Sequence, residues 1–261
     1  MTTSLRPPVL MLHGMCCTGD VWKQFRTFFE ARGARVYTPT LRPEQRIRAR
    51  PPRELRTLGF EHYVQDVIEI SAEIEREHAQ QPVVIGHSMG GLLAQVLAER
   101  GKVQAAVFIS PSPPAGVRTF AAHAWWATMA VGRALGAVPS AILPARATTN
   151  SIVFNRVPLD EREAAFVGMV HESGRAFLDL GRFAIDEKQV RVPVLTVAAG
   201  QDRLVPASLV RRTAQKYATV GGELLEYAGH GHWLYAEPGW EKPATEIYDW
   251  LAARTAAAGS A

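Results

Sequence analysis

Ser88 is the residue whose surroundings most clearly favour chemistry, because it stands in the pattern Gly86-x-Ser88-x-Gly90. A short β-branched run, residues 83–85, precedes this pattern and predicts a buried strand, and a helical pattern begins at Met89. A serine on so sharp a turn has a strained backbone, and the flanking glycines avoid collisions with neighbouring backbone. The pattern predicts that the Ser88 hydroxyl projects from the sheet beside a helix N-terminus, where backbone N–H groups can stabilise an oxyanion.

Two later strand ends carry the groups that a serine nucleophile needs. Serine is a weak nucleophile and requires a base within hydrogen-bond reach, with a carboxylate that holds this base in the right tautomer. Asp202 follows a predicted strand, and His230 and His232 follow the next one. The order serine, aspartate, histidine, each at a strand end, is far more specific than the serine motif alone. Together these residues favour acyl-transfer chemistry.

Short apolar strands alternate with amphipathic helices along most of the chain. We predict strands at residues 8–12, 34–37, 83–85, 103–109, 192–198 and 223–227, and helices at residues 18–33, 60–78, 89–100, 206–217 and 238–253. Such alternation predicts right-handed βαβ units, and therefore an α/β fold with a mostly parallel sheet flanked by helices. Reactive groups in such sheets gather at the carboxyl ends of the strands, which is where Ser88 and Asp202 are expected.

The alternation is interrupted between residues 115 and 190. This stretch holds helical patches rich in Ala, Trp and Met at residues 121–135, 159–170 and 175–183, separated by prolines. We expect residues 115–190 to form an inserted helical cap over the carboxyl edge of the sheet. Residues 1–114 and 191–261 then form the core domain.

The bulk composition is that of a globular chain near the upper end of single-domain size. Of the 261 residues, 47% are hydrophobic and 21% are charged. A net charge of +4 is small for this length, so the charge does not favour nucleic acid as a partner. The arginines between residues 42 and 56 are interpreted as part of a solvated Pro/Arg-rich loop, with a polyanion or membrane-surface patch as the alternative.

Cys16 and Cys17 are the two cysteines of the chain, and they are adjacent. Neighbouring cysteines rarely meet disulfide geometry, and no zinc-type Cys/His spacing occurs, so neither a disulfide nor a metal site is expected. The first eight residues lack an apolar signal core, and no apolar run is long enough to span a bilayer. These features predict a cytoplasmic protein without a membrane span.

Four motifs near strand ends support a family resemblance. They are His13-Gly14-Met15, Gly86-His87-Ser88-Met89-Gly90-Gly91, Gly200-Gln201-Asp202-Arg203-Leu204-Val205-Pro206 and Gly231-His232-Trp233-Leu234-Tyr235-Ala236-Glu237-Pro238. With them the sequence resembles α/β-hydrolase-fold serine hydrolases of the esterase- and lipase-like kind that carry a helical cap. By this resemblance Ser88 is the nucleophile, Asp202 the orienting acid and a histidine beside Gly231 the base. The resemblance also implies an oxyanion hole formed by the backbone N–H groups of Met15 and Met89, and no metal or organic cofactor.

The family pattern selects between the two histidines. It places the catalytic one directly before an aromatic residue and a few positions ahead of Glu-Pro, which favours His232. His230 remains the alternative, with a pocket-lining or loop-buttressing role if His232 is the base.

Several other residues are candidates for the substrate pocket. They are His13, Cys16, His87, Trp125, Trp126, Met129 and Trp233. His13 is also interpreted as a hydrogen bonder that orders the loop carrying Met15, His87 as a buried imidazole and Cys16 as a small filler. The aromatic and methionine group at residues 125–129 either lines an acyl pocket or packs inside the cap.

The chain departs from many family members at its start. Only seven residues precede the first predicted strand, where relatives often begin with a β-hairpin. We therefore expect about six strands, with the strand at residues 34–37 at one edge of the sheet. That edge would pair across a homodimer or be covered by the Pro/Arg-rich segment.

The leading functional hypothesis is a carboxylesterase (EC 3.1.1) that cleaves an ester of an apolar small molecule through an acyl-enzyme on Ser88. A serine at this position argues against haloalkane or epoxide opening, which requires a carboxylate nucleophile. The same three residues would also serve a C–C bond hydrolase, an acyltransferase or an amidase, because fold does not decide the bond. A non-catalytic ligand-binding protein is the hypothesis of another class, disfavoured because all three catalytic positions are occupied.

Overall fold

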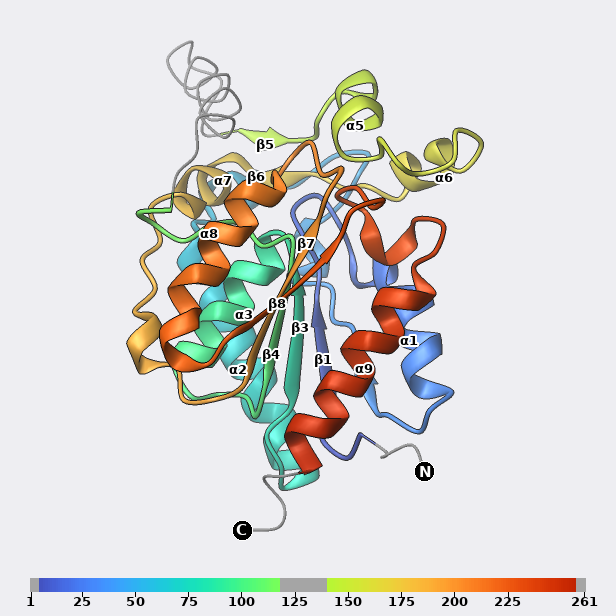
Figure 1. Ribbon diagram of the computed structural model, residues 1–261. Helices are drawn as coiled ribbons and strands as arrows, with labels where there is room; N and C mark the ends of the chain where they lie inside the picture. Colours follow the sequence, from blue (N-terminus) through green and yellow to red (C-terminus); the bar gives the residue numbers. More distant parts are fainter. Residues whose placement is uncertain (1–4, 118–139, 257–261) are drawn as a thin grey trace.

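A six-stranded, wholly parallel sheet forms the centre of the computed structural model, which describes residues 5–117 and 140–256 (Figure 1). The strands are β1 (Val9–Leu12), β2 (Val36–Tyr37), β3 (Val83–His87), β4 (Ala106–Ile109), β7 (Val194–Ala199) and β8 (Glu223–Tyr227). Their order across the sheet is β2-β1-β3-β4-β7-β8. Because all strands run the same way, their carboxyl ends share one edge.

Helices cover both faces of this sheet (Figure 1). One face carries α1 (Lys23–Glu30) and α9 (Glu241–Ala256), and the other carries α2 (Phe60–His78), α3 (Met89–Glu99) and α8 (Ala207–Tyr217). Short 3-10 helices lie at Gly19–Trp22, Pro43–Gln45, Arg53–Thr57, Glu187–Gln189, Ala218–Val220 and Leu234–Ala236. This is the layering that a parallel sheet requires, since both of its faces must be buried.

The central strands are apolar on both faces, and successive side chains enter opposite halves of the core. On β1, Val9 and Met11 pack with the α1 and α9 side, whereas Leu10 and Leu12 pack with the α2 and α3 side. All four side chains are fully buried. Because both faces of a central parallel strand are buried, a continuous apolar run in the sequence is the pattern that indicates such a strand.

The predicted α/β architecture with about six strands flanked by helices is confirmed. The edge position of β2 and the extent of α2, Phe60–His78, also agree with the prediction. Helix α9 begins at Glu241, whereas the sequence pattern predicts a start at Pro238. The difference arises because Gly239 has a φ of +85°, which a right-handed helix excludes.

Of the stretch that interrupts the strand–helix alternation, residues 140–180 lie beyond the carboxyl ends of the strands (Figure 1). They contain α5 (Arg146–Ile152), α6 (Arg162–Val167), α7 (Gly174–Leu180) and an antiparallel pair of short strands, β5 (Ala141–Ile142) and β6 (Glu172–Ser173). Helix α6 lies within a predicted helical patch and α7 begins one residue before another, but α5 and the strand pair were not predicted. Two-residue strands are too short to show an alternating pattern.

The Pro/Arg-rich segment, residues 40–59, is not the solvated loop that the sequence pattern favours. Arg46 is buried and forms an ion pair with Glu172 at 2.9 Å, with both side chains at most 1% exposed. Arg42 makes two hydrogen bonds of 2.7 Å to a carboxylate on α2, and Arg48 donates to backbone carbonyls near α6. The prediction is wrong for these three arginines because their partners are distant in sequence, so the local charge pattern does not reveal them. Arg50, Arg53 and Arg56 are exposed, as predicted.

Within the described ranges, the helices are all too short or too polar to cross a lipid bilayer.

Candidate active site

The candidate nucleophile and its partners come from three strand ends on the same edge of the sheet. Ser88 lies between β3 and α3, Asp202 follows β7, and His232 follows β8. All three are buried, and Ser88 and His232 line one cavity. The fold thus brings together three residues that lie far apart in the sequence.

Ser88 occupies a strained turn that only its glycine neighbours permit. Its φ of +55° and ψ of −115° place it outside the regions that non-glycine residues normally adopt. A Cβ on Gly86 would lie 2.0 Å from the carbonyl oxygen of Gly90, and a Cβ on Gly90 would lie 2.2 Å from the carbonyl oxygen of Leu12. Both contacts are with backbone, so no side-chain rearrangement relieves them. The pattern Gly-x-Ser-x-Gly is therefore a steric requirement of this turn.

Asp202 holds His232 in one orientation. Its Oδ2 atom lies 2.7 Å from Nδ1 of His232, and its Oδ1 atom accepts the backbone N–H groups of Leu204 and Val205, each at 2.8 Å. A carboxylate held by these donors accepts the Nδ1 proton, which leaves Nε2 of the imidazole unprotonated. His232 is thereby in the tautomer that a general base requires.

The Ser88 hydroxyl makes no hydrogen bond to the part of the chain that the structure describes. Its backbone is held instead: the Ser88 N–H donates to the carbonyl of Ile109, and the Ser88 carbonyl accepts the N–H of Ser112. Contacts between a serine nucleophile and its base are often long without substrate and tighten on binding.

Two backbone N–H groups stand where the sequence predicts an oxyanion hole. Met15 lies in the loop after β1 and lines the cavity, and Met89 is the first residue of α3. Within residues 5–117 and 140–256, neither N–H donates a hydrogen bond. Donors without a protein partner, one of them at a helix N-terminus, suit the binding of developing negative charge.

A buried carboxylate shapes the loop that carries His232. Glu237 is 1% exposed and accepts the backbone N–H of Gly231 at 2.6 Å and of Trp233 at 3.1 Å. His230 lies beside the same carboxylate, with its Nδ1 atom 3.5 Å from Oε2 of Glu237. The structure therefore pairs His232, and not His230, with Asp202. The role of Glu237 was missed, although it stands in a motif that carries the family resemblance.

The two other buried histidines near the site are neutral. His13 donates from Nδ1 to the carbonyl of Gly14 and accepts the N–H of Leu41 at Nε2, and burial and the charge of Arg46 lower its pKa to about 3. His87 donates from Nε2 to the carbonyl of His232, and burial and the neighbouring His232 ring lower its pKa. His13 was expected among the pocket residues and does not line the cavity. Through its hydrogen bond to the Gly14 carbonyl it orders the loop that carries Met15.

These two imidazoles predict a loss of stability in acid. Their pKa values are lower in the folded chain than in the unfolded chain, so unfolding takes up protons below the ordinary histidine pKa. The stabilisation is fully present above about pH 6.5 and is lost as the pH falls, at about 1.4 kcal/mol per pH unit for each histidine. Denaturant unfolding between about pH 7.5 and about pH 4.5 measures this slope.

Matched variants separate the buried histidines from other groups that titrate. His13→Gln keeps an acceptor for the Leu41 N–H and is expected to remove about half of the slope. His87→Gln keeps a donor for the carbonyl of His232 and is expected to remove the other half. A free energy of unfolding that stays flat below about pH 6.5 in the native sequence would contradict the assignment.

The cavity at this site has a volume of about 320 Å³ and an apolar wall. Its aliphatic, aromatic and thioether side chains come from several segments: Met15, Ile142, Leu143, Ile152, Val153, Met169, Phe177, Leu180, Leu204, Val205, Leu209 and Trp233. No lysine, arginine, aspartate or glutamate lines its described part. Of the predicted pocket residues, Cys16, His87 and Trp233 line the cavity, and Trp125, Trp126 and Met129 lie outside the described residues. The aliphatic members were missed because no local pattern links segments so far apart.

Cys16 and Cys17 both line the cavity as protonated thiols. Burial raises the pKa of both thiols, that of Cys17 to about 12. Cys17 donates from Sγ to the carbonyl of Met15 at 3.2 Å, and Cys16 donates to the carbonyl of Ile142. Thiols in this state are poor nucleophiles, so they act here as small apolar groups. Among the described residues, no group of His, Cys, Asp and Glu side chains is arranged to hold a metal ion.

Comparisons with known proteins identify a matching family model and several similar solved structures. The model of the "Alpha/beta hydrolase family" matches residues 9–245. No curated protein sequence gave a significant match. Similar solved structures include a methylesterase from Arabidopsis, with 14% identity, a TM-score of 0.73 and coverage of 95% of this chain and 99% of that one. A monoacylglycerol lipase from Paleococcus ferrophilus has 20% identity, a TM-score of 0.70 and coverage of 97% of each chain. Polyneuridine aldehyde esterase has 17% identity, a TM-score of 0.67 and coverage of 93% of this chain and 99% of that one.

Proposed function

The chain belongs to the alpha/beta hydrolase family, and we propose that it is a serine hydrolase that cleaves a carboxylic ester of an apolar small molecule. The observation that carries this proposal is the 2.7 Å hydrogen bond between Asp202 and His232, formed where His232 and the strained Ser88 face one apolar cavity. Nucleophile, orienting acid and base then follow one another along the chain in the order, and at the strand ends, expected of an α/β-hydrolase.

The proposed reaction has two halves. In the first, Ser88 Oγ attacks the ester carbonyl carbon while Nε2 of His232 takes the hydroxyl proton, and the amides of Met15 and Met89 hold the resulting oxyanion. The C–O bond to the alcohol then breaks, and His232 returns the proton to the departing alkoxide. In the second half, His232 deprotonates a water that attacks the acyl-enzyme, which releases the acid and restores Ser88.

The cavity wall supports an apolar and uncharged substrate. Its described lining carries no charged side chain, and much of it comes from residues 140–180, which we propose to be part of a substrate-binding cap. Burying a charged group against this wall would leave that group unpaired, which is costly. The solved structures similar to this chain include esterases and lipases, and this likeness agrees with the proposal by analogy of fold.

Covalent labelling tests the enzyme proposal. A fluorophosphonate probe should add one phosphonyl group to the native protein, and peptide mapping by mass spectrometry should locate it on Ser88. Ser88→Ala is expected to prevent labelling, because it removes the attacking oxygen. A folded native protein that is not labelled, or that is labelled at another serine, would refute the proposed role of Ser88.

A series of p-nitrophenyl esters tests the substrate class with the same protein. Because the cavity is apolar, kcat/KM should rise with the length of an unbranched acyl chain until the cavity of about 320 Å³ is filled. An ester with a terminal carboxylate should be hydrolysed more slowly than the neutral ester of the same length. Preference for the charged or the shortest esters would contradict the apolar substrate class, and would leave the role of Ser88 intact.

A further inference from the structure

The loop after β1, residues 14–17 and here called the oxyanion loop, is held through all of its carbonyl groups. His13 Nδ1 donates to the carbonyl of Gly14 at 2.8 Å, and the thiol of Cys17 donates to that of Met15. The carbonyl of Cys16 accepts the N–H of Val170 at 2.9 Å, and that of Cys17 accepts an arginine N–H at 3.3 Å. The N–H groups of the loop, that of Met15 among them, donate no hydrogen bond within the described residues.

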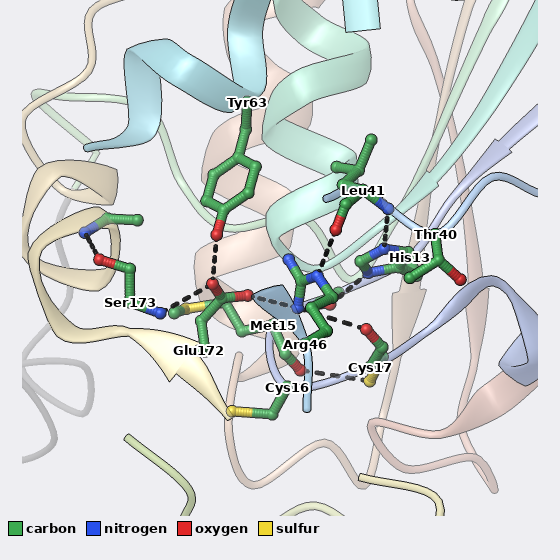
Figure 2. A network of polar contacts seen from close by, with 12 residues as sticks. His13, Met15, Cys16, Cys17, Thr40, Leu41, Arg46, Tyr63, Glu172 and Ser173 are labelled. Atoms are coloured by element: carbon green, nitrogen blue, oxygen red, sulfur yellow. Dashed lines mark hydrogen bonds and ion pairs between the residues drawn. The ribbon is translucent and has the colours of Figure 1, made fainter. Parts of the chain in front are cut away.

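Arg46 is the charged side chain that holds this loop (Figure 2). Its Nη1 atom donates to the carbonyl of Cys17, and its Nε atom donates to the carbonyl of Leu41 at 2.6 Å. The Leu41 N–H in turn donates to His13 Nε2 at 3.1 Å. The guanidinium therefore reaches the oxyanion loop at both ends, directly at Cys17 and through Leu41 and His13 at Gly14.

Glu172 fixes the guanidinium from the other side (Figure 2). Its Oε2 atom is 2.9 Å from Nη1 of Arg46, while its Oε1 atom accepts the hydroxyl of Tyr63 at 2.6 Å and the N–H of Ser173 at 2.8 Å. Glu172 lies on β6, in register with Ile142 of β5, whose side chain lines the cavity. One carboxylate thus connects the wall of the cavity to the loop that carries the Met15 N–H.

Stability alone is a weak explanation for this ion pair. Both side chains are at most 1% exposed, and the loss of hydration of two buried charges largely offsets their attraction. A hydrophobic pair of similar volume would serve a core equally well. What the charged pair adds is direction, because a guanidinium makes hydrogen bonds in a fixed planar geometry.

The backbone of the oxyanion loop needs such fixing. Cys16 has a φ of +59°, in the left-handed region that side chains other than glycine rarely adopt. A residue in this region persists only when its surroundings impose the conformation. The φ of Cys16 sets the peptide group between Met15 and Cys16, so its relaxation would shift the backbone of Met15 and, through it, the preceding peptide group that carries the Met15 N–H.

We propose that Arg46 and Glu172 are positioning residues that aim the Met15 N–H at the oxyanion of the reaction. The proposal rests on the function proposed above, in which that N–H is an oxyanion donor. It assigns the buried ion pair a role in stabilising the transition state, and none in binding the ground-state substrate.

The double variant Arg46→Met/Glu172→Gln tests this role without leaving a lone buried charge. The glutamine amide oxygen would remain an acceptor for Tyr63 and Ser173. The change removes the two charges, the guanidinium hydrogen bonds and the contact of the guanidinium with the Tyr63 ring. Loss of an oxyanion donor lowers kcat by about 10²- to 10³-fold, and we expect misalignment of one to lower kcat by about 10- to 100-fold. KM should stay within about twofold, because the interaction develops only in the transition state.

A pair of ketones distinguishes positioning from general damage to the site. An alkyl trifluoromethyl ketone adds the Ser88 oxygen to its carbonyl carbon and carries the resulting oxyanion, whereas the methyl ketone of equal length binds without addition. Affinity for the trifluoromethyl ketone should fall in parallel with kcat, by about 10- to 100-fold, and affinity for the methyl ketone should not change.

Two further variants complete the experiment. Arg46→Lys retains a cation beside Glu172 but loses the forked hydrogen bonds, and is expected to show the same pattern at about tenfold, even if the double variant does not fold. Arg42→Met/Asp66→Asn is the matched control, since it removes an ion pair of the same segment that does not contact the oxyanion loop. Its kcat should stay at the native level.

The outcomes separate this inference from the function on which it rests. A native protein that hydrolyses no ester and takes no label refutes the proposed function. A native protein that is active, with folded Arg46 variants of unchanged kcat, refutes only the positioning role. Equal losses of affinity for both ketones also refute it, because they indicate a cavity that is damaged as a whole.

Discussion

Replacing His232 with alanine is expected to lower kcat for ester hydrolysis by about 10⁵- to 10⁶-fold. The imidazole is the group placed to take the Ser88 proton, and its Nδ1 atom is engaged by Asp202 at 2.7 Å. Without a base the Ser88 hydroxyl stays protonated and attacks poorly, so labelling by fluorophosphonate should slow together with turnover. Steady-state kinetics and the time course of labelling measure both losses.

His230→Ala is the matched control for this experiment. His230 precedes His232 by two residues, but it lies beside Glu237 and makes no hydrogen bond or ion pair with Asp202 in the described structure. Its removal is expected to leave kcat within about fivefold of the native value. If His230→Ala abolishes turnover while His232→Ala retains it, His230 is the base and the role assigned to His232 is wrong.

Replacing Asp202 with asparagine is expected to lower kcat by about 10⁴-fold with little change in fold. The N–H groups of Leu204 and Val205 bind Oδ1 of Asp202 and would retain the amide oxygen of an asparagine there. The amide nitrogen would then face Nδ1 of His232 and donate to it. This moves the imidazole proton to Nε2, so His232 can no longer accept the proton of Ser88.

The asparagine variant also separates a role of Asp202 in catalysis from roles in folding and substrate binding. Thermal unfolding should show a folded protein, because both backbone donors keep their acceptor. The KM should change little, since Asp202 does not line the cavity. A kcat within about tenfold of the native value would show that the tautomer of His232 does not limit the reaction, and would contradict the role assigned to Asp202.

The elements of this fold were readable from local sequence because each has a local cause. Apolar runs such as residues 83–85 are long enough for a buried strand, and the 3.6-residue pattern of residues 60–78 matches α2. The turn at Ser88 could also be predicted, because the turn itself excludes side chains at Gly86 and Gly90. A Cβ on Gly86 would collide with the backbone of Gly90, and a Cβ on Gly90 would collide with the backbone at the end of β1.

Other features have causes that no local pattern records. The strands β5 and β6 consist of two residues each and exist only through their pairing. Arg46 resembles its exposed neighbours in sequence, yet it is buried because Glu172 meets it from across the fold. The apolar cavity wall is likewise assembled from segments that lie far apart in the chain, from the loop after β1 to the loop after β8.

The sequence by itself determined the parallel α/β architecture and three candidate catalytic positions at strand ends, because hydrophobic period, turn sterics and chain order are local properties. The family pattern already favoured His232 over His230, and the structure shows the hydrogen bond between His232 and Asp202. Tertiary structure alone decided why His13 stays outside the cavity and how Arg46 reaches the oxyanion loop. These outcomes depend on distances between residues that are remote in the chain. Only the packed fold, which buries the charges and fixes their hydrogen-bond partners, determines such distances.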